Sequence, residues 1–129
     1  MRFEFLELPG ENIARPVVPV TVEGLTNSPQ LCLLDTGALH NRFGAWLADI
    51  AGIDLSDADQ QRIAVGGVVT TAHEATTQLS IEGVVWDAPV WFCDPWPFPF
   101  HLLGQEGFFR WFDVRIRAAH YLVDVEDES

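Results

Sequence analysis

The four residues Asp35, Thr36, Gly37 and Ala38 carry the clearest chemical signal in the sequence. They follow the apolar run LCLL, which is typical of a short strand covered on both faces. A carboxylate at the end of a buried strand is costly unless it is hydrogen-bonded or used. Thr36 offers a side-chain donor, and Gly37 lets the backbone turn sharply. The residues suit an acid–base carboxylate presented at a tight turn, but they equally suit an Asp that only caps the turn.

A second motif, Leu102-Leu103-Gly104, favours the first of these interpretations. The order of the two motifs, with a stretch of strands between them, resembles the retropepsin-like aspartic protease family. Its pattern is two apolar residues before D-[TS]-G-[AS], and later two apolar residues before Gly. The glycine-containing stretch AVGGVV lies between the motifs, where that family has a hairpin flap. The resemblance covers about Pro16 to Glu126.

The resemblance implies a fold and a set of roles. The fold would be all-β, a single-domain acid-protease closed β-barrel with one short α-helix and a flap hairpin. Asp35 would be the catalytic carboxylate. The other implied site residues are the active-site turn (Thr36, Gly37, Ala38), the flap (Gly66, Gly67, Val68) and the support behind the turn (Leu102, Leu103, Gly104). The hydroxyl of Thr36 would join two such turns, and Gly37 would admit the substrate.

Two positions depart from the retroviral members of that family. Those members have an Asp after D-T-G-A and an Arg after the later Gly, and the two side chains form an ion pair that helps the dimer. Here the positions hold Leu39 and Gln105. Because both partners are absent together, no orphaned charge is expected, and the dimer needs other contacts. A sheet shared between chain termini is the candidate.

The local patterns along the chain indicate strands with one helix. A helix is expected within 42–53, where Phe43, Trp46, Leu47 and Ile50 have helical spacing and Gly52 would end it. Two strands should meet in a hairpin at Gly66. The remaining expectations are strands within 3–8, 16–24, 31–35 and 84–94 (with a break at Pro89), an aromatic loop at 95–100 and a closing hairpin around 118–119.

Length and composition limit the function classes. The 129 residues suffice for one domain, taken as 1–129 with its core at about 16–126 and a frayed tail at 127–129. A net charge of −12 argues against a nucleic-acid partner. No apolar run approaches a membrane span, no secretion signal is visible, and a cytoplasmic location is expected.

The four His residues lack metal-ligand spacing and are expected at surfaces or turns, and neither metal nor cofactor is expected. Cys32 and Cys93 are expected as buried thiols.

The chemistry implies a second copy of the chain. Peptide hydrolysis by water needs a base and an acid, and the sequence has a single D-T-G. The expected function is therefore an aspartic endopeptidase that cleaves polypeptides with two Asp35 carboxylates from a homodimer. One alternative is a catalytically silent module of the same fold that binds peptides or dimerises. Another is a chain that dimerises only on a partner. Candidate pocket walls are Leu39, Val68, Val69 and the aromatic loop, which could equally cover the core.

Overall fold

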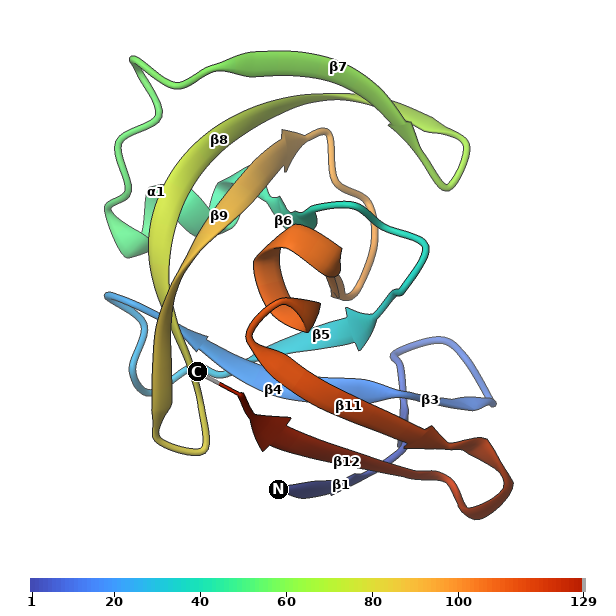
Figure 1. Cartoon of the computed structure of the whole chain (residues 1–129). Helices are drawn as coiled ribbons and strands as arrows, with labels where there is room; N and C mark the ends of the chain where they lie inside the picture. Colours follow the sequence, from blue (N-terminus) through green and yellow to red (C-terminus); the bar gives the residue numbers. More distant parts are fainter. Residues whose placement is uncertain (129) are drawn as a thin grey trace.

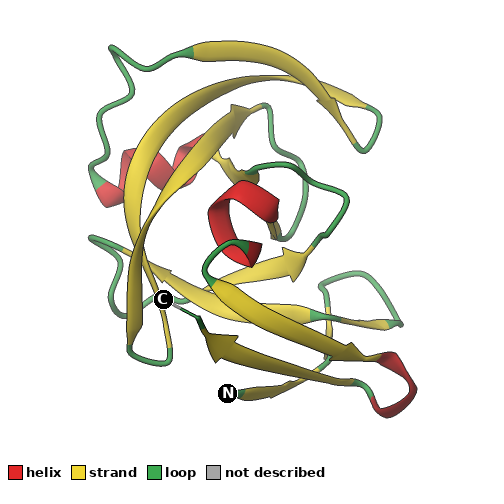
Figure 2. Cartoon of the chain, viewed as in Figure 1, coloured by secondary structure: helices red, strands yellow, loops and turns green. Residues whose placement is uncertain are grey.

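Strands dominate the structure, a computed structural model that describes residues 1–128 (Figures 1 and 2). The strands are β1 (Arg2–Glu4), β2 (Leu6–Glu7), β3 (Ala14–Arg15), β4 (Val17–Val22), β5 (Gln30–Leu34), β6 (Asn41–Gly44), β7 (Gln60–Val65), β8 (Val68–Ile81), β9 (Val84–Asp94), β10 (His101–Leu103), β11 (Phe112–Arg117) and β12 (Leu122–Asp127). The helical segments are α1 (Ala45–Ala51), the π-helical turn η1 (Gln105–Phe109) and the 3-10 turn η2 (Ala118–His120).

Six strands close into a barrel. They follow the order β4–β5–β10–β6–β9–β8, and β8 pairs back onto β4 through Thr21↔Ser80 and Val22↔Leu79. β7 lies outside the closed ring as the partner of β8, and the two form the long curved ribbon of Figure 1. Buried apolar side chains fill the interior, with Phe43, Phe92 and Phe108 the largest. The predicted all-β barrel with one short α-helix is confirmed.

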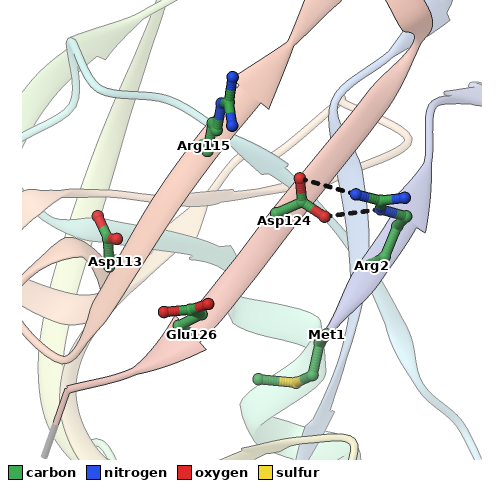
Figure 3. A pocket seen from close by; sticks show the side chains of 6 residues that line it. All are labelled: Met1, Arg2, Asp113, Arg115, Asp124 and Glu126. Carbon is green, nitrogen blue, oxygen red and sulfur yellow. Dashed lines mark hydrogen bonds and ion pairs between the residues drawn. The ribbon is translucent and has the colours of Figure 1, made fainter.

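The chain termini form a separate three-stranded sheet in the order β1–β12–β11. Because β12 is paired on both sides, only the outer edges of β1 and β11 are open to a further strand. Mostly charged side chains line a hollow of about 390 Å³ on this sheet. Figure 3 shows Arg2 bonded to Asp124 there. Asp35 does not line this hollow.

The predicted helix is shorter than its pattern. Phe43 lies in β6, paired in parallel with β9, and the helix begins only at Ala45. Gly52 ends it as expected, with a φ of 76°. Of the residues at helical spacing, Leu47 is buried, whereas Trp46 is 47% and Ile50 is 63% exposed. The helical spacing therefore included one residue that belongs to a strand, and the helix itself buries only a narrow face.

Other local predictions can be placed in the structure. β7 and β8 form the hairpin at Gly66 and Gly67, whose φ values of 54° and 80° suit a tight turn. β9 runs through Pro89 without a break, because its pairing with β6 begins only at the next residue and no donor is needed on that side. The closing hairpin turns at η2. Of the tail expected to fray, Asp127 ends β12 and the N–H of Glu128 donates to the carbonyl of Trp111, while residue 129 lies outside the described residues.

Candidate active site

Asp35 stands at the surface end of β5, where the chain makes a tight turn. Its N–H donates to the carbonyl of Leu103 at 3.0 Å, and its carbonyl accepts the N–H of Ala38 at 3.1 Å. Its Oδ1 accepts the N–H of Gly37 at 2.9 Å. Thr36 and Gly37 are exposed, and Asp35 is half-buried. The turn thus presents an oriented carboxylate at the protein surface, together with two exposed residues beside it.

The second motif lies directly beside this turn. β10 runs parallel to β5, with Leu102 opposite Leu33 and Leu103 opposite Leu34. After the strand, the N–H groups of Gln105 and Glu106 donate to the carbonyls of Ala38 and Leu39 at 2.9 and 2.7 Å. The two motifs, far apart in the sequence, are therefore held together by backbone hydrogen bonds.

Gly104 stands at the closest approach of the two motifs. A Cβ there would lie 2.5 Å from the carbonyl oxygen of His40 and 2.8 Å from that of Ala38. Both are backbone atoms fixed in the turn, so a side chain could enter only by pushing the motifs apart. The third residue of the Leu102-Leu103-Gly104 motif must be glycine for this steric reason.

Asn41, which follows the Asp35 turn in the chain, bonds to Gly104 of the second motif. This residue was not identified from the sequence. The side chain is fully buried; its Oδ1 accepts the N–H of Gly104 at 3.0 Å, and its Nδ2 donates to the carbonyl of Gly107 at 3.1 Å. Trp86 also donates its Nε1–H to that carbonyl, at 2.9 Å. No signal in the stretch HNRF distinguishes this Asn from one in an exposed turn.

The two departures from the retroviral pattern have a visible consequence. Gln105 donates its Nε2–H to the carbonyl of Thr36 at 2.8 Å, so a neutral amide holds the tip of the turn. Leu39 is 53% exposed beside it. The two positions that form an ion pair in the retroviral members are thus occupied here by an apolar residue and by an amide bonded to the turn.

Two cavities lie between the Asp35 turn and the β7–β8 hairpin. One, of about 160 Å³, includes Phe98 and Phe100 in its wall. The other, of about 310 Å³, includes Leu39 and Arg42. Four residues line both cavities: Asp35, Leu102, and Val65 and Gly66 of the hairpin. We call the two cavities together the Asp35 groove.

The groove contains some of the expected lining residues. Leu39, Phe98, Phe100 and Gly66 line it, whereas Gly67, Val68 and Val69 do not. Val69 points to solvent, with 56% of its surface exposed. The aromatic loop serves both suggested purposes, because Trp96 is buried and the two phenylalanines face the groove.

His101 contradicts the expectation that the histidines lie at surfaces or turns. It is 4% exposed in β10, its Nδ1 accepts the N–H of Gly44 at 3.1 Å, and its Nε2 is 3.3 Å from Oε1 of Gln30. These partners suit the neutral ring with its proton on Nε2. Burial lowers the pKa of His101 from 6.5 to about 4. The two cysteines are buried thiols, as expected, and burial raises the pKa of Cys93 to about 11.

Acid should therefore destabilise the fold through His101. Above its ordinary pKa the ring is neutral in both folded and unfolded chains; as the pH falls from 6.5 toward 4, the unfolded chain takes up a proton that the folded chain does not. Between about pH 7 and about pH 4.5 this group should remove about 2 to 3 kcal/mol from the free energy of unfolding. His101→Gln keeps an acceptor and a donor but does not titrate. Urea unfolding at both pH values should show a smaller acid loss for the variant, and an equal loss would refute this assignment.

No metal or membrane signal emerges within residues 1–128. No group of three or more His, Cys, Asp or Glu side chains there is placed to hold a metal ion. None of the helices in that range is long and apolar enough to cross a bilayer.

Comparison with known proteins places this geometry in a family. A family model described as aspartyl protease matches residues 18–106. The chain belongs to this family. The matched span contains both the Asp35 turn and Leu102-Leu103-Gly104, so the resemblance to retropepsin-like aspartic proteases is confirmed. Curated protein sequences give no match.

Solved structures of retropepsin-like proteins share the fold. The retroviral protease-like domain of Ddi1 from Leishmania major has a TM-score of 0.65 and 15% identity, covering 89% of this chain and 90% of that one. A retropepsin-like aspartic protease from Rickettsia conorii has a TM-score of 0.66 and 18% identity, covering 95% of this chain and 88% of that one. At these identities the likeness concerns the fold, and the retropepsin-like barrel is confirmed.

Proposed function

We propose that this aspartyl protease family member is an endopeptidase that hydrolyses polypeptides at a site shared by two copies of the chain. The observation that carries the proposal is the position of Asp35, a carboxylate oriented by Gly37 on a turn that faces a groove. Family membership makes peptide hydrolysis the first chemistry to consider for such a carboxylate.

The reaction requires two carboxyl groups. An ionised carboxylate takes a proton from water, whose oxygen attacks the carbonyl carbon, while a protonated carboxyl gives its proton to the carbonyl oxygen. The tetrahedral intermediate then collapses, the C–N bond breaks, and the leaving nitrogen takes a proton. Two carboxyls about 3 Å apart fill both roles because they cannot both ionise and so share one proton.

The second carboxyl comes, in this proposal, from the Asp35 of another chain. Asp35 is the only Asp of the sequence followed by Thr-Gly. Thr36 and Gly37 are exposed beside it, as residues at a two-fold axis would be in the isolated chain. Gln105 stiffens the tip of the turn through the carbonyl of Thr36, and Gly104 and Asn41 fix its base. The two outer edges of the terminal sheet, on β1 and β11, are the places where a partner could extend the contact.

The substrate is an extended segment that lies in the Asp35 groove under the β7–β8 hairpin. The hairpin tip at Gly66 lines the groove opposite Asp35, and Phe98, Phe100 and Leu102 form apolar walls. In this proposal the hairpin acts as the flap, with Gly66, Gly67 and Val68 at its tip. An extended chain offers its backbone groups to such a cover and its side chains to the walls.

Titration with a transition-state mimic tests the shared site. A peptide whose scissile bond is replaced by a statine-type hydroxyl should bind the protein tightly, with an end point of one inhibitor for every two chains. Calorimetry on Asp35→Asn provides the control, since its site lacks the ionisable pair. An end point of one inhibitor per chain, or no binding at any pH where the protein is folded, would contradict the proposal.

A further inference from the structure

The Asp35 groove carries a positive charge as well as a carboxylate. Arg42 lies in β6, opposite Leu102 on one side and Trp91 on the other, and it lines the larger cavity together with Asp35. Among the described residues that line the groove, these two are the charged ones, and the others are apolar or glycine. A guanidinium in such an otherwise apolar wall has to be explained, because charged side chains are mostly exposed and are almost never fully buried unless they are paired.

Arg42 has no carboxylate partner within residues 1–128. The ion pairs recorded there, Arg2–Asp124, Arg15–Glu11 and Arg110–Glu106, use other arginines. Its guanidinium lies 5.8 Å from the centre of the Trp91 ring, and its Nη1 is buried without a hydrogen-bond partner. Burial lowers the pKa of Arg42, so its charge is poorly solvated.

Two more polar atoms near Arg42 are unsatisfied. The indole Nε1–H of Trp91 and the Nδ1 of His40 are both buried without a partner, and the two rings lie 5.6 Å apart. Buried polar atoms in native proteins are nearly always hydrogen-bonded, and of these three only the Arg42 guanidinium belongs to a residue that lines the groove. Arginine and indole offer only donors, and a carboxylate offers only acceptors.

The sheet register gives the distance between Arg42 and Asp35. Leu102 pairs with both Arg42 and Leu33, so Arg42 lies two strands away from Leu33, which precedes Asp35 by two residues. Two strand spacings and two residues correspond to roughly 10 and 7 Å, before the arginine side chain extends. These perpendicular components combine to roughly 12 Å, which an extended substrate covers with roughly three or four residues at about 3.3 Å per residue.

We propose that Arg42 binds a carboxylate of the substrate, so that the site prefers polypeptides with Asp or Glu within three or four residues of the cleaved bond. The inference rests on the proposed function, since it concerns the same groove. Two copies of the chain would place one Arg42 on each side of the paired Asp35 residues, so an acidic residue is accepted on either side. The preference comes from contact, because the chain's charge of −12 repels acidic peptides at a distance.

A peptide library measures this preference. Acetylated and amidated peptides are randomised on both sides of a central apolar pair, and the cleaved products are read by mass spectrometry. The protein should enrich Asp and Glu near the cleaved bond, and kcat/KM for a Glu peptide should exceed that of its Gln counterpart by about ten- to a hundred-fold. Arg42→Gln should bring that ratio close to unity, and Arg42→Glu should favour Lys instead. Arg115→Gln removes the same charge from an exposed position on β11, outside the groove, and should leave the ratio unchanged.

A binding experiment separates this inference from the proposed function. Fluorescence anisotropy on Asp35→Asn, which has no catalytic carboxylate, should show tighter binding of the labelled Glu peptide than of the Gln peptide, and Arg42→Gln in that background should abolish the difference. A peptide with Gln side chains and a free terminal carboxylate tests whether a chain end serves as well. If no peptide is cleaved but the Glu peptide binds through Arg42, the proposed function fails and this inference stands. Cleavage or binding without an acidic preference, or a preference unchanged in Arg42→Gln, would overturn it.

Discussion

Replacing Asp35 with Asn should abolish peptide cleavage, lowering kcat/KM by roughly a thousand-fold or more. In a homodimer the substitution removes both carboxyl groups at once, so neither a base for water nor an acid for the carbonyl oxygen is left. The fold should be unaffected, because the Asn side-chain oxygen can still accept the N–H of Gly37. Cleavage of an unstructured peptide library at mildly acid pH, with urea unfolding in parallel, measures both effects.

The matched control for this variant is Asp49→Asn. Asp49 is exposed on α1, outside the groove, and its substitution makes the same change in charge. Full activity is expected there. If Asp35→Asn cleaves as well as the native chain, the carboxylate is not the catalytic group. If neither protein cleaves anything while both fold and dimerise alike, the chain is a silent peptide-binding or dimerising module.

Mixing the two forms extends the test to the shared site. When Asp35→Asn chains are added in excess and subunits exchange, most native chains pair with a variant chain and lose the second carboxyl. The activity per native chain should then fall toward zero. Activity that stays proportional to the native chain would show that one chain suffices.

The second large effect is expected at Asn41, whose truncation should destabilise the fold. Asn41→Ala leaves the N–H of Gly104 without an acceptor, removes a donor from the carbonyl of Gly107 and opens a small cavity. The expected loss in the free energy of unfolding is about 3 to 5 kcal/mol, since each unsatisfied buried group costs about 1 to 3 kcal/mol. Urea unfolding measures the loss.

Asn27→Ala is the matched control, because Asn27 is exposed in a turn. It should change stability by no more than about 0.5 kcal/mol. Asn41→Asp adds a second comparison: it keeps an acceptor for Gly104 but cannot donate to Gly107 unless protonated, so its stability should improve toward low pH relative to the native chain. A loss for Asn41→Ala as small as that of the control would mean that the two motifs are held together without this side chain.

Short-range chemistry accounts for the features that were readable in the linear chain. The Asp35-Thr36-Gly37-Ala38 turn follows an apolar strand, the β7–β8 hairpin turns on two adjacent glycines, and α1 ends at Gly52. In each case the decisive groups lie within a few residues of one another, because a glycine in the left-handed region directs the backbone locally. The two motifs were also readable, since each is a contiguous pattern.

Residues that depend on distant partners could not be recognised in this way. Asn41 bonds to residues 63 and 66 positions away, and His101 bonds to the backbone 57 positions away. A polar residue between apolar ones has the same local pattern whether it is buried and satisfied or exposed in a turn. Arg42 faces the groove only because β6 lies between β9 and β10 in the sheet order. Barrel closure decided these three placements. It brings together strands that are far apart in the sequence, so the residues around each position do not show which partner it will meet.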